Sequence, residues 1–352
     1  MPTIDSDAHV IESSSTWSHM RDFERDFRPQ IFRRIAEGES QPTSAPLEEC
    51  WVIDGRLHSK SGNVATDLAA GARDLTDIGR RLKHMDQVGI DVQVLYPSLF
   101  LRPLTRDHDT EYALVRSYNR WLASIWSQSN NRLRWVAAPP LLSLIDPIKV
   151  REELEFCKAN GACGIFMRGM ECERLLTHRY FFPLYEMALE LDLALTLHAG
   201  VNSFAMYEAI PLNTGNLLLF KFPLIGAFSA LLEAEMPQRF PNLRWGFIEA
   251  SAQWVPYILG EVSMRLARRG KQLPSSPLEG SNFFITTQKS DDLPWLVSEI
   301  GDDALLIGTD YGHKDTSAEV DALKRLGQDG SVSRSTTDKI LKTNPGILYG
   351  IS

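Results

Sequence analysis

Short apolar runs alternate with longer amphipathic segments along almost the whole chain, in a repeated strand-then-helix order. Several runs are continuously apolar, which is typical of parallel strands buried on both faces. The runs are residues 3–6, 91–96, 134–138, 162–167, 194–197, 243–248, 282–286 and 304–307. Helical patterns lie between them at residues 77–88, 110–128, 147–160 and 181–191. Gly89, Gly161 and Gly301 suit helix C-caps. Eight such units predict a (β/α)8 barrel.

The length of 352 residues, of which 43% are hydrophobic, fits one large barrel with an insertion or two ordinary domains, and the repeated units favour a single barrel domain over residues 1–352. A doubly wound sheet is the alternative, and it would place a ligand at one topological switch point. Candidate ligands instead follow the first, fifth and eighth runs, which only closure into a barrel brings together. The active site is then expected at the C-terminal ends of the strands.

Two segments depart from the even spacing of strands and helices. Residues 10–75 separate the first strand from its helix, contain Trp17 and Trp51, and show little periodicity. We expect this insertion to form a lid or an interface element. Residues 332–349 predict a C-terminal helix followed by a tail.

Charge and apolar patterning exclude several classes of partner. The formal charge is −8, and no basic run exceeds pairs such as Arg268-Arg269, which argues against nucleic acid. Neither a membrane span nor a signal peptide is indicated, so we expect a cytoplasmic protein. The four cysteines form no C-x-x-C pair, and we expect them to be reduced and structural. They are Cys50, Cys157, Cys163 and Cys172.

Metal-ligand side chains stand at the ends of three of the predicted strands. Asp7 and His9 are two residues apart, so both project to one side of an extended chain. His198 follows the fifth run, and Asp310 follows the eighth between two glycines. Singly, these residues suit a surface turn, a core histidine or a cap for a helix beginning near Ser317. Together they predict a mixed nitrogen and oxygen site for Zn²⁺, Mn²⁺ or Fe²⁺.

At these motifs the chain resembles the amidohydrolase superfamily. The closest resemblance is to the amidohydrolase-2 branch, which includes aminocarboxymuconate semialdehyde decarboxylase-like and resorcylate decarboxylase-like enzymes. It covers nearly the whole length, and it implies that Asp7, His9, His198 and Asp310 hold a catalytic divalent metal ion. The residues that carry it are Asp7-Ala-His-Val-Ile-Glu12, Arg81-Leu-Lys-His-Met-Asp-Gln-Val-Gly-Ile-Asp-Val92, Leu197-His-Ala-Gly200, Gly308-Thr-Asp-Tyr-Gly-His313 and Ile340-Leu-Lys-Thr-Asn-Pro-Gly-Ile-Leu-Tyr-Gly350.

Two positions depart from that family pattern. Glu249 stands after the sixth strand, where the decarboxylases usually offer a catalytic histidine; it suits a metal ligand, a general base or a buried ion pair. Arg168 ends the fourth strand, where binuclear members carry a carboxylated lysine. Its planar guanidinium suits a substrate carboxylate, or a structural ion pair at the barrel rim.

The predicted site therefore has three parts. Asp310, Glu249 and His198 are the predicted catalytic residues, with Asp310 both binding the ion and shuttling a proton. Glu249, Glu12 and His313 are candidate ligands for a second ion. Arg168 and Trp254 are the predicted substrate-binding residues, although packing against the sixth helix is the safer interpretation of Trp254.

Three functions remain open from the sequence. The leading hypothesis is a metal-dependent hydrolase or nonoxidative decarboxylase acting on a small carboxylate or amide. The second is a dinuclear Mn/Fe-type centre that activates O₂, because the resemblance extends to subunits of a 2-aminoisobutyrate hydroxylase. The third is a noncatalytic partner stabilised by metal. The apolar segment 217–232 offers a surface for a homo-oligomer, or for a hetero-oligomer with a homologous subunit.

Overall fold

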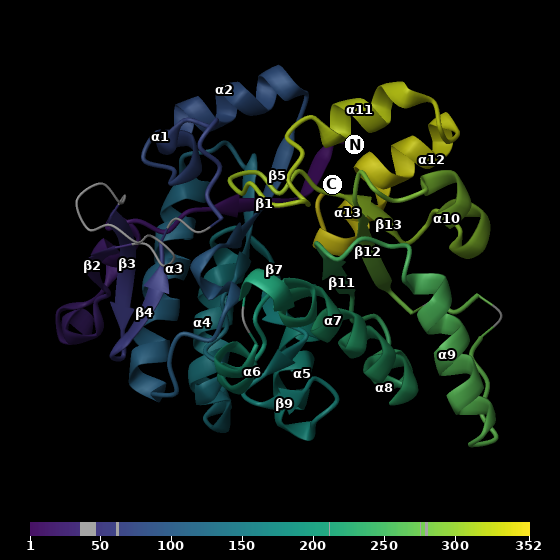
Figure 1. The fold of residues 1–352 in the computed structure, drawn as a ribbon, viewed down its shortest axis with the longest axis horizontal. Coiled ribbons are helices and arrows are strands. Elements are labelled where there is room, and N and C mark those ends of the chain that lie inside the picture. The colour runs from purple at the N-terminus through teal and green to yellow at the C-terminus, as the bar shows by residue number, and fades with distance from the viewer. Residues whose placement is uncertain (36–46, 61–62, 211, 275, 279–280) are drawn as a thin grey trace.

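Eight parallel strands form one sheet in the order β1, β5, β6, β7, β10, β11, β12, β13 (Figure 1). The computed structural model describes residues 1–35, 47–60, 63–210, 212–274, 276–278 and 281–352. The strands are β1 Ile4–Val10, β5 Val92–Pro97, β6 Leu133–Ala137, β7 Ala162–Arg168, β10 Ala194–His198, β11 Trp245–Ile248, β12 Phe283–Thr287 and β13 Leu305–Ile307. Each of the eight predicted runs falls on one of these strands.

The sheet closes where β1 meets the segment after β13. The His9 amide donates to the Tyr311 carbonyl at 2.7 Å, and the Asp310 amide donates to the Asp7 carbonyl at 2.9 Å. Gly308 permits this approach, because a Cβ there would lie 2.3 Å from the Cβ of Asp7. The predicted (β/α)8 barrel is therefore confirmed, and a doubly wound open sheet is excluded.

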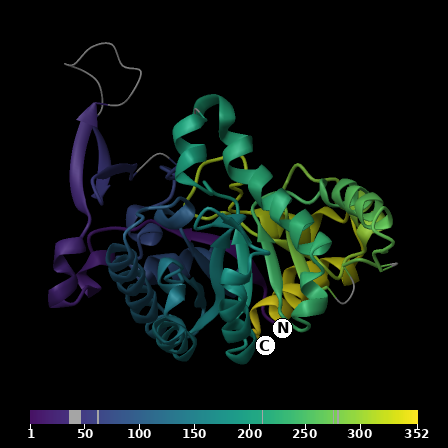
Figure 2. The same ribbon diagram turned by 90° about the horizontal axis from the view of Figure 1, so that it is seen from below.

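Helices surround the strands in both views (Figures 1 and 2). Asp77, Asp107 and Asp292 each cap a helix by accepting a main-chain N–H with the side chain. The longer helices are α2 Ile78–Val88, α3 His108–Ser127, α4 Pro147–Ala159, α5 Phe182–Glu190, α7 Leu212–Glu233, α9 Val255–Ala267, α10 Leu293–Ile300 and α11 Ala322–Asp329. The short ones are α1 Ala70–Arg73, α6 Phe204–Ala209 and α8 Met236–Arg239. The helix expected near Ser317 begins only at Ala322, so Asp310 does not cap it.

The insertion after β1 contains a small antiparallel sheet that its irregular sequence pattern did not predict. Its strands are β2 Gln30–Ile35, β3 Leu47–Ile53 and β4 Arg56–Ser59, preceded by the 3₁₀ helices η1 Thr16–His19 and η2 Asp22–Phe27. Figure 2 shows this sheet standing beside the barrel. Trp17 and Trp51 pack edge to face at 6.0 Å, and both belong to a buried cluster with Leu99, Leu104 and Leu114 of the β5–α3 region. This shared cluster fixes the insertion to the barrel.

The chain ends in the predicted helical segment, built from three consecutive pieces. These are α12 Arg334–Asp338, the π-helical η6 Lys339–Thr343 and α13 Asn344–Tyr349. The Tyr349 hydroxyl lies 2.8 Å from that of Tyr96 and donates to the Ser6 carbonyl at 2.8 Å. The segment therefore packs against the barrel strands β1 and β5.

One helix, α7, is long and apolar enough to cross a membrane by length and composition alone. Its 18-residue window Asn216–Glu233 is 33% buried, and Leu224, Phe228 and Leu231 belong to the main core cluster. These core contacts are those of a helix that covers a barrel. Leu217, Leu218 and Phe222 remain exposed on the same helix.

Candidate metal centre

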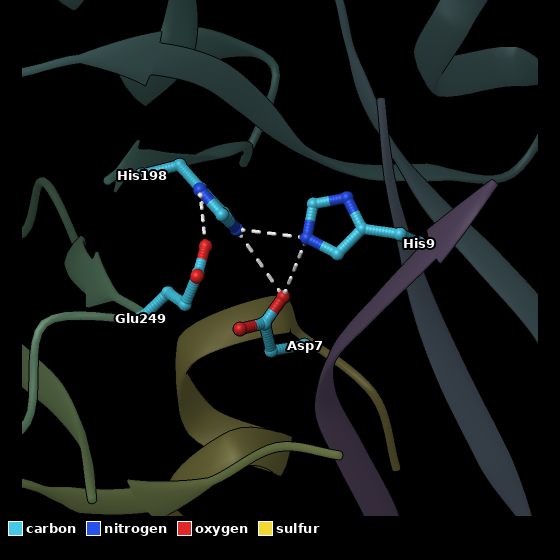
Figure 3. Close-up of side chains that lie close together, drawn as sticks. All are labelled: Asp7, His9, His198 and Glu249. Atoms are coloured by element: carbon cyan, nitrogen blue, oxygen red, sulfur yellow. Dashed lines mark hydrogen bonds and ion pairs between the residues drawn. The ribbon is translucent and has the colours of Figure 1, made fainter. Parts of the chain in front are cut away.

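Four of the predicted site residues converge at the mouth of the barrel (Figure 3). Asp7 and His9 come from β1, His198 ends β10, and Glu249 follows β11. One ligand atom of each lies within 4.8 Å of the others, and all four side chains are buried. The structure therefore brings together, from three separate strands, the residues that the sequence predicted as neighbours.

The hydrogen bonds of the two histidines define which nitrogen carries the proton. His9 Nδ1 lies 3.1 Å from the Pro97 carbonyl, and His198 Nδ1 lies 2.8 Å from the Ala199 carbonyl. A carbonyl only accepts, so each ring carries a proton on Nδ1, and in a neutral ring Nε2 keeps its lone pair. The two Nε2 atoms face each other at 3.1 Å, with Asp7 Oδ1 at 3.3 Å from that of His198 and 3.4 Å from that of His9. When both rings are neutral, three acceptors therefore meet with no hydrogen between them.

A second group of ligand atoms is formed by His9, Asp310 and His313. The His313 ring stacks on that of His9 at 3.9 Å, and its Nε2 lies 2.7 Å from Ser98 Oγ. Ser98 Oγ donates its one hydrogen to the Val10 carbonyl, so it accepts from His313 Nε2. His313 Nδ1 therefore carries a lone pair, and it faces Asp310 Oδ1 at 2.8 Å.

Asp315 is a member of the cluster that the sequence reasoning missed. It forms a third group of ligand atoms with Glu249 and Asp310, and Asn63 of the insertion donates to it at 2.8 Å. The sequence signal that could have identified Asp315 is its position five residues after Asp310, in the same loop at the strand end. Glu249 and Asp310 both adopt left-handed backbone conformations, with φ of 67° and 49°. Such strain in non-glycine residues concentrates at functional sites.

The buried acids and bases of the cluster have displaced pKa values. Burial raises the pKa of Glu249 and of Asp310 well above the ordinary range, and neighbouring carboxylates raise both further. Burial also lowers the pKa of His9, and lowers that of His313 strongly. For Asp7, the adjacent His198 and His9 outweigh burial and lower the pKa. Protein groups alone therefore leave Glu249 and Asp310 protonated, whereas a bound cation would favour their ionised forms.

The donor set fits a divalent metal ion. Both oxygens of Asp310 and Nδ1 of His313 are buried without a hydrogen-bond partner among the described residues. Ligands placed roughly 2.0–2.2 Å from a shared ion stand about 3–3.5 Å apart, and the acceptor contacts of Asp7, His9 and His198 lie at 3.1–3.4 Å. A site with imidazole and carboxylate but no thiolate suits Zn²⁺, Mn²⁺ or Fe²⁺.

A hydrogen-bonded layer beneath the cluster holds Asp7 in place. Asp5 accepts from the Thr309 hydroxyl at 2.6 Å, the Thr309 amide at 2.9 Å and the Gln93 amide group at 2.8 Å. Gln93 in turn accepts from Arg81 Nε at 2.6 Å, and Arg81 Nη1 donates to the His9 carbonyl at 3.3 Å. Burial raises the pKa of Asp5 to about 6. This layer ties β1 to β5 and to the segment after β13, and it orients the ligand strand.

A cavity of about 530 Å³ opens in front of the cluster. Glu249, His313 and Asp315 line its inner wall, and Glu12 lines it with both carboxylate oxygens accepting the main-chain N–H groups of Ser98 and Leu99. Burial raises the pKa of Glu12 to about 7. The insertion contributes Trp51, Ser59, Lys60, Asn63 and Val64, and α7 contributes Asn216, Leu217, Phe220 and Lys221. The cavity is thus bounded by the insertion on one side and by α7 on the other.

Comparison with known proteins decides the family. The amidohydrolase family model matches residues 4–351. The chain belongs to the amidohydrolase family. It is therefore an enzyme of the amidohydrolase superfamily.

Solved structures share the fold of this amidohydrolase over their whole lengths. An amidohydrolase from Mycobacterium avium subsp. paratuberculosis is 19% identical, with a TM-score of 0.79 and 99% of both chains covered. The 5-carboxyvanillate decarboxylase LigW from Sphingomonas paucimobilis is 16% identical, with a TM-score of 0.71 and 100% of both chains covered. The 4-oxalomesaconate hydratase LigJ from Rhodopseudomonas palustris is 20% identical, with a TM-score of 0.65, covering 99% of this chain and 96% of that one. No curated protein sequence matches the chain.

The two predicted substrate-binding residues of this amidohydrolase both make contacts with other groups of the protein. Arg168 forms a buried ion pair with Glu171, through Nη2 and through Nε at 3.0 Å, and its Nη1 donates to the Phe100 carbonyl at 3.4 Å. The Trp254 indole N–H donates to the Ser251 carbonyl at 2.7 Å, and its ring packs on Phe228. Neither residue lines the cavity in front of the cluster. These contacts agree with the structural alternatives that the sequence left open, but Arg168 also lines a second cavity of about 300 Å³, so substrate binding by Arg168 and Trp254 stays a prediction.

Proposed function

We propose that this amidohydrolase is a metal-dependent hydrolase or nonoxidative decarboxylase that acts on a small carboxylate or amide. The observation that supports this most directly is the meeting of Asp7 Oδ1 with the unprotonated Nε2 atoms of His9 and His198. When both rings are neutral, a cation stabilises this group of acceptors. Two structural neighbours, a decarboxylase and a hydratase, support the proposal, because their reactions are carbon–carbon bond cleavage and hydration on this fold.

The positions and charges of the site residues suggest separate metal-binding and proton-transfer roles. Asp7, His9, His198 and Asp310 would hold the ion, which when bound lowers the pKa of a water molecule or polarises a carbonyl group. Glu249 faces the cavity beside His198, with Oε2 at 3.4 Å from His198 Nδ1, so it is placed to take or give a proton. Asp310 is the second proton-transfer candidate, because burial and neighbouring carboxylates favour its protonated form.

A second candidate function is supported by a specific observation. His313 Nδ1 faces Asp310 Oδ1 at 2.8 Å, which makes a second pair of facing acceptors when Asp310 is ionised, and Glu249 and Asp315 adjoin Asp310. Two adjacent ions that share Asp310 or Glu249 would fit this arrangement. Such a pair of ions would make this chain a subunit of a Mn/Fe-type oxygenase, similar to 2-aminoisobutyrate hydroxylase. Glu12 stands apart from this group, because its two oxygens already accept main-chain N–H groups.

Elemental analysis of protein purified without added metal tests both candidates. One ion per chain and turnover without O₂ support the hydrolase or decarboxylase. Two redox-active ions per chain and oxygen consumption support the oxygenase. His198→Ala would lose all metal, whereas His313→Ala would lose one ion of two only in the dinuclear case. Metal-free protein with full activity would contradict both proposals.

We further propose a soluble, cytoplasmic enzyme that forms a homo-oligomer or pairs with a homologous subunit. The exposed Leu217, Leu218 and Phe222 of α7 support an interface on that helix. A noncatalytic role beside an active partner is the remaining alternative. Activity of the purified chain alone, with its molar mass measured by light scattering, decides between these assemblies.

A further inference from the structure

Arg102 stands at the junction of two cavities. It follows β5 and the short 3₁₀ helix η3 Leu99–Leu101, on a loop at the C-terminal end of the barrel. One cavity is that in front of the metal-ligand cluster; the other, of about 300 Å³, extends past Phe166, Arg168 and Glu171. Among the lining residues described for the two cavities, Arg102 is the one that they share. Its guanidinium is therefore placed where a ligand reaching the cluster would pass.

Arg102 is the cation that lines both cavities, and no carboxylate of the described residues neutralises it. Lys221 of the first cavity also lacks a carboxylate partner among them, but its ammonium group donates to Gln288 Oε1 at 2.9 Å. Arg168 is paired with Glu171, and Lys60 is paired with Glu49 at 2.9 Å. No ion pair within 4 Å joins Arg102 to any residue that the structure describes, and its Nε is buried without a hydrogen-bond partner. Burial lowers the pKa of Arg102, and Tyr207, which also hydrogen-bonds to its side chain, and Glu12 offset only part of that effect. An arginine stays charged in such surroundings, so its charge is left for a ligand.

We propose that Arg102 anchors a carboxylate of the substrate, separate from the group that reacts at the metal-ligand cluster. This inference rests on the proposed function and transfers to Arg102 the role that the sequence assigned to Arg168. It defines the substrate class as a carboxylate in which the anionic group and the reacting group lie apart. Arg102 is a positioning residue in this scheme, since it belongs to none of the groups of metal-ligand atoms.

The shape of the Arg102 guanidinium favours a carboxylate. A planar fork binds a carboxylate with two parallel hydrogen bonds. Lys60 and Lys221 also line the first cavity, but Lys60 is paired with Glu49, and Lys221 does not reach the second cavity.

The test is a binding measurement on the metal-loaded enzyme. Calorimetric titrations with acetate, benzoate and inorganic phosphate are compared with the neutral probe benzamide, for wild type, Arg102→Gln and Arg102→Lys. Arg106→Gln is the matched control, because Arg106 lies on the same loop and lines only the second cavity, where it is exposed and stacks over Phe204 at 4.5 Å. Metal per chain is measured in the same samples, and circular dichroism checks folding.

We expect Arg102→Gln to weaken carboxylate binding at least about tenfold, or about 1.4 kcal/mol, while benzamide binding changes less than about twofold. Arg102→Lys should retain part of the affinity, and Arg106→Gln nearly all of it. Unchanged benzoate binding in Arg102→Gln would overturn the proposal. Equal loss of benzamide binding, tighter binding of phosphate, or no carboxylate binding to wild type would do so as well. Absence of metal from every sample would instead refute the proposed function.

Discussion

The Nε2 atoms of His9 and His198 face each other at 3.1 Å, and the Nδ1 atom of each ring faces a main-chain carbonyl. A neutral imidazole cannot turn its proton toward the other ring without giving up its carbonyl partner, and a second proton on either ring would place a positive charge in a buried site. The site is therefore unfavourable in the absence of a cation, and metal binding should stabilise the fold. This relationship leads to a prediction that needs no knowledge of the substrate.

A chelator should lower the melting temperature of the wild-type protein by several degrees and should leave that of His198→Ala almost unchanged. The reason is that His198→Ala removes one of the facing acceptors and the metal together. Differential scanning calorimetry with and without chelator, and metal content by elemental analysis, measure this. His108→Ala, on the exposed start of α3, is the control and should respond as wild type does. Equal chelator shifts in all three proteins would contradict the prediction.

Gly308→Ala should reduce metal content and destabilise the protein by more than about 2 kcal/mol. The added Cβ would lie 2.3 Å from Asp7 Cβ and 2.9 Å from the Asp7 amide nitrogen, so β1 must move and carry its ligands with it. Gly327→Ala is the matched control, because a Cβ there meets nothing within 4 Å on α11. That change should be neutral or stabilising by up to about 1 kcal/mol. Urea unfolding and metal analysis of both variants measure the difference.

Much of the barrel follows from the sequence because parallel strands buried on both faces leave continuous apolar runs. The positions of Asp7, His9, His198 and Asp310 follow in turn, because each stands at the end of such a run. The three-stranded sheet of the insertion was not predicted, since its short strands carry exposed residues such as Ile31 and Phe32 and no regular alternation. Its core forms only with Leu99 and Leu114 of the barrel, which are distant in sequence.

The roles of Arg168 and Arg102 could not be predicted from the sequence. Arg168 ends a strand as a binding residue would, but its ion pair depends on the turn that brings Glu171 back beside it. Arg102 gave no motif, because its significance lies in the lack of a partner and in the two cavities that meet at it. Both facts belong to packing, which a pattern of residue types along the chain does not specify.

Stability should fall as the pH rises from about 5 to 9, in part through Glu111. Burial raises the pKa of this partly buried carboxyl group from its ordinary value of 4.5 to about 8. A carboxyl whose pKa is higher in the folded state stabilises fully below its unfolded pKa, and that contribution is lost as the pH rises through the folded value. Glu111→Gln should therefore match wild type near pH 5 and be more stable near pH 9, by about 1 kcal/mol or more.

Urea unfolding of wild type and Glu111→Gln across this range measures the Glu111 effect. The amide oxygen of glutamine can still accept the Leu142 N–H, which Glu111 accepts at 2.8 Å, so the substitution preserves the contact. Glu155→Gln on α4 is the control: that carboxylate is exposed and lies 4.0 Å from Arg151, and its removal should give a pH dependence like that of wild type. A Glu111→Gln protein that loses stability with pH as steeply as wild type would refute the assignment.

The Arg168–Glu171 pair should act on stability more than on substrate binding. Both side chains are buried, so Glu171→Gln leaves the Arg168 charge uncompensated and should cost about 3 kcal/mol, whereas Arg168→Gln should cost less because Glu171 can take up a proton. The double variant should recover part of the loss, which gives a coupling energy from urea unfolding. The exposed Arg151–Glu190 pair is the reference, and Glu190→Gln should cost less than about 1 kcal/mol. If Arg168 instead grips the substrate, Arg168→Gln would raise KM with little change in stability, and the coupling would be near zero.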